Sequence, residues 1–384
     1  MRVATLNVWG LPWPISREGS ARMQAIGARL PALELDWMAF QEVWTGSARA
    51  QLIEAGRRAG LVHAWHRGAA LGGSGLLVLS RAPFASAHFE AYTLRGFPER
   101  IWHADYHGGK GFCALRFPAA GGSVTLIDTH LHAQYGDDAY DDEHPHRLAQ
   151  AVQIAAAIAA IRDPVVAAGD FNMSEGRREY AVFTGLSGMR DAAALLDHRQ
   201  PTTLGTNPYR DERPPHDHER IDYVFARDGD GARLRVRSIE RIFDEPPAGG
   251  PAAYSDHAGL IAEIELVPDA ASRAPAPEAA AAELAGRVLA EGREAALARR
   301  GAQRLSAAGA LGVAAVAVAG ARQPLLSRRR VLRAGLGAGA LVALPFGLSN
   351  AALAEIAIPD EVRAFDAVRE QLAALQARVA PPPG

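Results

Sequence analysis

Cysteine is almost absent from this chain of 384 residues. The one cysteine, Cys113, excludes an intramolecular disulfide, which fits a reducing compartment without requiring one. An excess of charge is also absent, because the formal net charge at pH 7 is only -2. The protein as a whole therefore has no positive field that would draw it to polyanions such as nucleic acid. A nuclease does not strictly need such a field, although a basic groove would help it.

The N-terminal segment lacks the features of a signal peptide. No charged region followed by an apolar run is present there, so we expect no cleaved signal and a cytoplasmic N-terminal domain. The segment instead contains RVATLNVWG, an apolar strand that carries the polar residue Asn7. The length of the chain suits one large domain with an appendage.

Residues 1–267 alternate β-like apolar runs with turn signals and a few helical stretches. Helices are predicted at 21–30 and 147–161. Strands are predicted at Val3–Val8, Leu35–Gln41, Gly75–Ser80, Gly111–Phe117, Val124–His130, Val165–Ala168, Ile221–Ala226 and Leu260–Leu266. The order shows no regular βαβ alternation, so we expect a mixed α/β fold with many antiparallel connections.

The composition changes sharply after residue 267. Residues 268–304 are rich in alanine, proline and charge, which indicates a linker followed by a polar helix. Residues 305–354 contain two apolar stretches, and residues 355–384 are predicted to form an amphipathic helix with a proline-rich end. We therefore expect one folded domain, 1–267, followed by a helical tail.

Three interpretations of the two apolar stretches are open. A transmembrane helix needs about 20 largely apolar residues, and both stretches are near that length, so a membrane anchor is favoured. A soluble helical cap is the second interpretation. The third is a twin-arginine export signal, because SRRRVL begins at Ser327 before an apolar run. At this internal position such a signal would reflect a fused or misassigned reading frame.

The topology of a membrane anchor is also open. Arginines between the two apolar stretches favour a cytoplasmic middle loop. A two-pass hairpin would place this loop and the N-terminal domain on opposite sides of the membrane, which conflicts with a cytoplasmic N-terminal domain. A helix that lies on the membrane or re-enters it would remove the conflict.

Six short strings, far apart in the chain, carry the residues of a candidate active site. They are TLNVWG (Thr5–Gly10), QEVW (Gln41–Trp44), DTHLH (Asp128–His132), GDFNM (Gly169–Met173), RIDYV (Arg220–Val224) and YSDH (Tyr254–His257). Together they supply carboxylates and amides for a hard cation, and imidazoles for proton transfer and charge. This combination is typical of metal-assisted attack of water on a phosphate ester.

In this order, the six strings resemble the endonuclease/exonuclease/phosphatase superfamily, which includes DNase I-like nucleases, inositol polyphosphate phosphatases and sphingomyelinases. The resemblance covers roughly residues 1–267. It implies an α/β (α+β) fold, a DNase I-like sandwich of two sheets flanked by helices, to which this sequence adds a C-terminal apolar helical tail. Such a sandwich gathers its site at strand ends.

The resemblance, together with side-chain chemistry, assigns metal ligands. Glu42 follows a buried apolar run and is expected to be the main ligand of Mg²⁺, which needs only one or two carboxylates besides substrate oxygens and water. Asn7 is expected to offer an amide oxygen to the same region. The alternatives are a strand-end salt bridge for Glu42 and an asparagine that satisfies buried backbone for Asn7.

The same resemblance assigns catalytic roles around a histidine. His257 is the candidate general base, since a neutral imidazole can take a proton from water. Asp222 is expected to orient the His257 ring and to stabilise its imidazolium form. Asp256 is expected to lie near the metal or near this pair.

Further catalytic residues are expected around the phosphate. Asp170 would hold the attacking water, Asn172 would donate to a phosphate oxygen, and a protonated His130 would neutralise developing charge. The alternatives are Asx-turns for Asp170 and Asn172, and a strand histidine with satisfied hydrogen bonds for His130. Whether His132 supports the site is left open.

Four other strings resemble the Mg²⁺-dependent neutral sphingomyelinases: Gly72–Phe84, Tyr92–Phe112, Thr129–Tyr135 and His144–Ala151. This resemblance implies hydrolysis of sphingomyelin to ceramide and phosphocholine, or cleavage of a related choline lysophospholipid at the same bond. Lys110, between glycines in GGKG, is expected to bind the phosphate, and the alternative is a solvated lysine in a turn. The spacing is not that of a nucleotide P-loop.

Two loops favour a membrane lipid over nucleic acid as the partner. WGLPWPIS, which contains Trp9, Leu11 and Trp13, follows Asn7 and suits a lipid at an interface, although plain packing is the alternative. The loop 136–146 is acidic and would repel a polyphosphate, unless an additional cation reverses the sign.

Other functions remain as alternatives, and the sequence does not define the oligomeric state. The first alternative is an endonuclease, or another phosphodiesterase or phosphatase of the superfamily. The second belongs to a different class of protein: a membrane-bound interaction protein with an inactive site.

Overall fold

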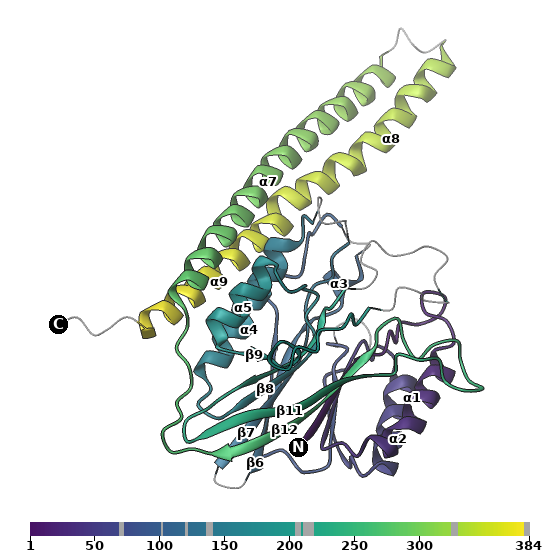
Figure 1. Ribbon diagram of the computed structural model, residues 1–384. Coiled ribbons are helices and arrows are strands. Elements are labelled where there is room, and N and C mark those ends of the chain that lie inside the picture. The colour runs from purple at the N-terminus through teal and green to yellow at the C-terminus, as the bar shows by residue number, and fades with distance from the viewer. Residues whose placement is uncertain are drawn as a thin grey trace, which may run out of the picture.

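The structure is a computed structural model that describes residues 1–68, 73–100, 103–119, 122–135, 141–203, 209, 219–323 and 329–379. Two β-sheets pack face to face, helices cover their outer faces, and a long helical hairpin projects from this body (Figure 1). The predicted α/β (α+β) sandwich with an apolar helical tail is confirmed.

Each sheet has six strands within the described ranges and mixes parallel with antiparallel pairs. Sheet A consists, in spatial order, of β11 (Ala232–Ile242), β12 (Gly259–Pro268), β1 (Arg2–Asn7), β2 (Trp37–Gln41), β4 (Leu77–Ser80) and β3 (His63–His66). Sheet B consists of β5 (Ser86–Ala91), β6 (Gly111–Ala119), β7 (Gly122–His130), β8 (Val165–Asp170), β10 (Asp222–Arg227) and β9 (Arg190–Asp191).

Helices pack on the outer face of each sheet. Sheet A is covered by α1 (Gly19–Leu33) and α2 (Gly46–Arg58), whose apolar faces form one buried cluster with the strands. Sheet B is covered by α4 (His144–Ala160) and α5 (Arg178–Ser187). The helices α3 (Ala104–His107) and α6 (Ala192–Leu195) are single turns.

Alternation along the central strands decides which side chains face the opposite sheet. In β8, Val166 and Ala168 pack between the sheets, whereas the residues beside them pack against helices. Because successive side chains point to opposite faces of a strand, Asp170 also points between the sheets. The same alternation directs three further strand-end residues into that space: Asn7, His130 and Asp222.

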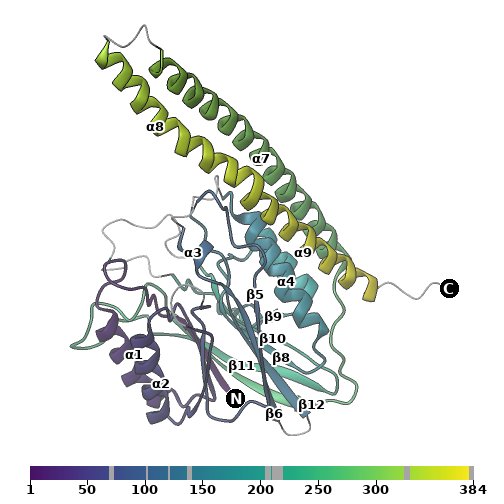
Figure 2. The ribbon, with the colours of Figure 1, turned by 180° about the vertical axis from the view of Figure 1, so that it is seen from behind.

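The C-terminal region consists of α7 (Ala279–Ala321), α8 (Arg330–Ala352), a π-helical turn η3 (Leu353–Ala357) and α9 (Ile358–Val379). The first half of α7 and most of α9 pack on α4 and α5, where Val288, Leu289 and Phe365 join the same buried cluster. Beyond this base, α7 and α8 run side by side away from the sheets (Figures 1 and 2). By length and composition alone, both arms could cross a membrane, which is weak evidence for membrane association.

The predicted polar helix and the first apolar stretch form one continuous helix, so the boundary expected at residue 305 lies inside α7. The division into a domain that ends at residue 267 and separate tail segments stays a prediction. The twin-arginine-like string from Ser327 and the acidic loop 136–146 lie partly outside the described residues.

Candidate active site

Candidate residues from both sheets gather at one end of the sandwich. In sheet B, His130 pairs with Asp170 across β7 and β8, and Asp170 pairs with Asp222 across β8 and β10, so the three lie side by side. In sheet A, Asn7 ends β1, and Glu42 directly follows β2. The parallel pairing of β1 with β2 brings these two ends together.

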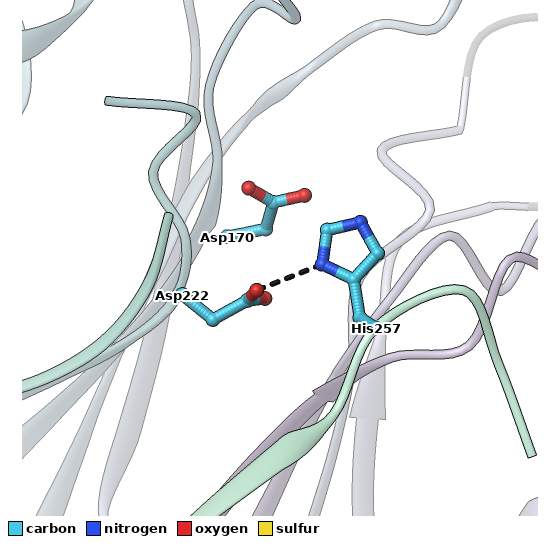
Figure 3. A group of neighbouring side chains, drawn as sticks. All are labelled: Asp170, Asp222 and His257. Carbon is cyan, nitrogen blue, oxygen red and sulfur yellow. Dashed lines mark hydrogen bonds and ion pairs between the residues drawn. The ribbon is translucent and has the colours of Figure 1, made fainter. Parts of the chain in front are cut away.

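His257 and Asp222 form a hydrogen-bonded pair. The Nδ1 atom of His257 lies 2.7 Å from Oδ2 of Asp222, and both side chains are buried (Figure 3). The backbone N–H of Asp222 donates to Thr202 Oγ1 at 3.1 Å, which fixes the start of β10. Burial alone would lower the pKa of His257, but the Asp222 carboxylate and the nearby Asp170 raise it well above the ordinary value.

Asn7 joins the two sheets at the site. Its Nδ2 donates to Glu42 Oε1 at 3.0 Å and to Asp170 Oδ2 at 2.9 Å. Its Oδ1 accepts the backbone N–H of Trp9 at 2.9 Å. The sequence suggested that the amide oxygen would face the metal, whereas here the amide nitrogen faces the carboxylates. The role of Asn7 as a metal ligand stays a prediction.

The carboxylates at this end suit a cation. Burial and the neighbouring Asp256 carboxylate raise the pKa of Glu42. A cation bound beside Glu42 would therefore stabilise its ionised form. Asp170, Asp222 and His257 also offer ligand atoms within 4.8 Å of one another. A metal bound among these three would displace the proton between His257 and Asp222. Glu42 therefore stays the predicted ligand at the candidate cation site, since a carboxylate oxygen suits a hard divalent ion.

Lys110 is buried at the site, with a residue exposure of 4%. Its Nζ lies 2.8 Å from Asp105 Oδ1, 2.8 Å from His130 Nε2 and 2.7 Å from the carbonyl oxygen of Leu131. The alternative of a solvated lysine is therefore wrong. All three ammonium protons already have acceptors, so Lys110 would have to exchange one partner to bind a phosphate.

His130 lies between Lys110 and Asp170. Its Nε2 accepts from the Lys110 ammonium and is 3.4 Å from Asp170 Oδ2. Burial and the Lys110 charge lower the pKa of His130 well below its ordinary value, so the ring is neutral and carries its proton on Nδ1. The Nδ1 atom has no hydrogen-bond partner among the described residues. The protonated form considered from the sequence is therefore disfavoured.

Asn172 adopts a left-handed backbone conformation, with φ of 47°, directly after β8. Its backbone N–H donates to Asp170 Oδ1 at 3.0 Å, which is the Asx-turn considered as an alternative for Asp170. Its Nδ2 donates to the carbonyl oxygen of Leu131 at 3.0 Å, the same acceptor that Lys110 uses. His132, whose role the sequence did not decide, is buried, and its Nδ1 lies 3.7 Å from Asp105 Oδ2.

Several supporting residues were not predicted from the sequence. Arg22 is fully buried and donates to the backbone carbonyls of Val8 (2.7 Å), Trp9 (2.8 Å) and Tyr254 (3.1 Å). It thereby joins the loop after Asn7 to the loop that carries His257. No sequence pattern marks it, because its acceptors are main-chain atoms.

A second unpredicted contact lies below the site. Gln41 donates from Nε2 to Asp128 Oδ1 at 2.7 Å, between the two sheets. Gln41 precedes Glu42, and Asp128 precedes His130 by two residues. Both residues lie inside motifs, QEVW and DTHLH, and this was the only sequence feature that could have indicated their role beneath the site.

Solved structures share this fold. TDP2 from D. rerio, in complex with a single-strand DNA product, has a TM-score of 0.54 at 19% identity, with 69% of this chain and 98% of that chain covered. Beta toxin from Staphylococcus aureus has a TM-score of 0.52 at 17% identity, with 68% and 99% covered. At these identities the similarity shows the fold alone.

The family is shown by the sequence itself. Residues 4–257 match the Endonuclease/Exonuclease/phosphatase family, and the chain belongs to that family. Relatives include a candidate neutral sphingomyelinase of Drosophila melanogaster (32% identity, 69% of this chain) and sphingomyelin phosphodiesterase 2 of Homo sapiens (30%, 69%). Inositol phosphosphingolipids phospholipase C of Schizosaccharomyces pombe is 32% identical over 70% of this chain. The matches span 61%, 64% and 69% of these proteins, respectively.

Proposed function

We propose that the chain is a Mg²⁺-dependent phosphodiesterase that hydrolyses a phosphosphingolipid, with sphingomyelin as the first candidate substrate. The observation that carries this proposal is the His257–Asp222 pair beside the Glu42 and Asp170 carboxylates. The names of the relatives support the substrate class. Sphingomyelin and inositol phosphosphingolipids carry different alcohols on the phosphate, and both contain the bond between phosphate and ceramide.

The proposed reaction transfers a phosphoryl group to water. The water oxygen bonds to phosphorus, the bond from phosphorus to the ceramide oxygen breaks, and that oxygen takes up a proton from solvent. His257 accepts the proton of the attacking water at Nε2, because its Nδ1 is engaged by Asp222. Asp222 stabilises the imidazolium that forms. With sphingomyelin the products are ceramide and phosphocholine.

Other residues position the reactants. Asp170 orients the water from the centre of sheet B, where it pairs with the strand that carries Asp222. The neutral His130 is suited to donate from Nδ1 to a phosphate oxygen. Asn172 and Lys110 both donate to the carbonyl oxygen of Leu131, the residue that follows His130. His130 and Asn172, and Lys110 once it exchanges one of its three acceptors, would stabilise negative charge on the phosphoryl group.

Mg²⁺, when bound, would act as a Lewis acid on the phosphoryl oxygens and the departing oxygen. Glu42 would hold it, and Asp256 lies near enough to raise the pKa of Glu42. Asn7 would contribute its amide oxygen only after releasing the N–H of Trp9. Asp256 also raises the pKa of His257, so its charge acts on both the cation site and the proposed base.

The partner in this proposal is a membrane lipid, and the protein is membrane-associated through the hairpin of α7 and α8. Apolar side chains such as Val316, Val331 and Leu341 are exposed along the arms. If both arms cross the bilayer, the loop between them and the catalytic domain lie on opposite sides. If the catalytic domain is cytoplasmic, the arginines of that loop then lie on the non-cytoplasmic side of the membrane, contrary to the positive-inside rule.

The test is release of phosphocholine from sphingomyelin in mixed micelles, with Mg²⁺ or with EDTA, for wild type and His257→Ala. Release that needs both the metal and His257 is expected. Inositol phosphosphingolipid micelles and supercoiled plasmid are assayed in parallel. Metal-dependent nicking of the plasmid without lipid turnover would overturn the substrate and identify a nuclease, and no turnover of any ester would overturn the enzyme.

A further inference from the structure

We propose that the loop Leu11–Ser16 beside the active site is a membrane contact that inserts Trp13 and Ile15 into the surface of a lipid bilayer. The inference rests on the proposed function, since it concerns how that site reaches a lipid phosphate. It adds a contact on the catalytic domain, separate from the helical hairpin.

The loop exposes large apolar side chains. Trp13 is 83% exposed and Ile15 is 61% exposed, and no large hydrophobic residue in the described part of 1–267 is more exposed than Trp13. The two lie on one turn, in which the N–H of Ile15 donates to the carbonyl of Pro12 at 3.0 Å. The residues of the loop carry no charge. A cluster of exposed apolar groups without charge is typical of an interaction surface.

The loop is held firmly to the site at both ends. At its start, the N–H of Gly10 donates to the carbonyl oxygen of Glu42 at 3.0 Å, and an added Cβ at Gly10 would lie only 2.3 Å from that oxygen. At its end, Ser16 is buried and donates to the carbonyl of Trp9 at 2.9 Å. Arg22 donates to Ser16 Oγ at 2.5 Å. The exposed turn therefore has a fixed position relative to the candidate cation site.

The loop and the hairpin lie at the same end of the molecule. The loop follows the end of β1, where the site forms. Helix α7 begins beside the C-terminal end of α5, far from the site, and runs toward the site end. It passes Pro145, at the start of α4, near Gly292. The remainder of α7 then extends past the strand ends, as both views show (Figures 1 and 2).

A bilayer is the partner that fits this arrangement. A surface that receives the apolar arms of the hairpin would face the strand ends and the loop together. Tryptophan favours the headgroup region, because its ring is apolar and its N–H can stay in water. A phosphosphingolipid presents its phosphate at that same depth. Seating Trp13 and Ile15 in the interface would bring Glu42 and His257 to the level of the phosphate.

The test uses the full chain reconstituted in sphingomyelin vesicles, with Trp13→Ala, Ile15→Ala and the double variant. Each is compared on vesicle sphingomyelin and on a water-soluble phosphodiester of p-nitrophenol. The double variant should lower the ratio of vesicle to soluble turnover about tenfold, through loss of apolar burial at the interface. Val62→Ala is the matched control, since Val62 is 56% exposed and follows α2 at the opposite end of sheet A. It should leave the ratio unchanged.

A second measurement does not depend on catalysis. The fluorescence of wild type minus that of Trp13→Phe isolates Trp13, and it should shift to shorter wavelength with vesicles and be quenched by brominated lipid. An absent shift, or an equal fall of both activities in the double variant, would overturn the membrane contact. If wild type hydrolyses neither ester while Trp13 still shifts, the proposed function fails and the contact stands.

Discussion

The Nδ1 atom of His257 lies 2.7 Å from Oδ2 of Asp222, 35 residues earlier in the chain, and this bond fixes which nitrogen of the ring can act on water. An isolated β-bridge pairs Thr203 with His257, just before β12. At the start of β10, Thr202 Oγ1 accepts the backbone N–H of Asp222. The bond therefore depends on a small hydrogen-bonded corner around residues 202, 203 and 222.

Asp222→Asn should preserve the fold and lower kcat by about 10³ to 10⁴, because the ring loses its orienting partner and its stabilised imidazolium form. The Asp222 carboxylate also raises the pKa of His257. A base is active when deprotonated, so activity rises with pH through its pKa, and this limb should move to lower pH in the variant. Profiles of kcat/KM against pH measure both effects. An unmoved limb with a normal rate would remove His257 as the base.

Glu42→Gln tests the cation site by binding rather than by rate. Mg²⁺ should raise the Tm of wild type, since a ligand of the folded state stabilises it, and should leave the Tm of the variant unchanged. Without metal, the variant should be more stable than wild type, because burial and Asp256 both disfavour the Glu42 charge. Thermal denaturation with MgCl₂ and with EDTA measures both. An equal metal shift in both proteins would place the cation elsewhere.

Lys110→Met should destabilise the domain by about 3–5 kcal/mol, because it leaves the Asp105 carboxylate buried without its cation. The double variant with Asp105→Asn should recover most of that loss. Urea denaturation of the two single variants and the double variant gives the coupling free energy. Additive losses would show that the pair does not act as a unit.

The sequence predicted the site's strand ends well, for a physical reason. Central strands such as β1 and β8 are mostly apolar, so a polar residue at the last position, Asn7 or Asp170, is conspicuous. Alternation then directs both into the space between the sheets. The exposed strands β3 and β5 were not predicted, because neither contains an apolar run. Their extended conformation depends on hydrogen bonding to the neighbouring strand.

Contacts between distant segments could not be predicted in the same way. Asp105 lies in the short helix α3, and nothing in its neighbourhood indicates that it pairs with Lys110. Arg22 binds carbonyl oxygens that every residue possesses. The amphipathic character of the last helix was predictable, but its packing partner α4 was not, because many apolar faces are equally compatible with it.

His132 should make stability depend on pH. Burial lowers its pKa to about 3, against about 6.5 in the unfolded chain. Between these values the unfolded state binds more protons than the folded state. The stabilising contribution of the neutral His132 is therefore complete above pH 6.5, and the free energy of unfolding falls as the pH falls toward 3. From pH 7 to pH 5, wild type should lose about 2 kcal/mol more than His132→Gln. Urea denaturation at each pH measures the difference, with His198→Gln at an exposed histidine as the control. Parallel curves would contradict the assignment.

Glu361 of α9 should hold the helical tail onto the catalytic domain. Its buried Oε1 accepts from His146 Nε2 of α4 at 2.8 Å and from Arg299 of α7 at 2.5 Å. Glu361→Gln leaves Arg299 without part of its counter-charge, so the urea midpoint should fall by an amount that corresponds to about 3 kcal/mol. Glu355→Gln is the control, because Glu355 pairs with Arg304 on the exposed part of the hairpin, and it should leave the midpoint unchanged. A wild-type midpoint for Glu361→Gln would mean that this contact adds nothing to the stability of the domain, and that apolar packing alone holds the tail.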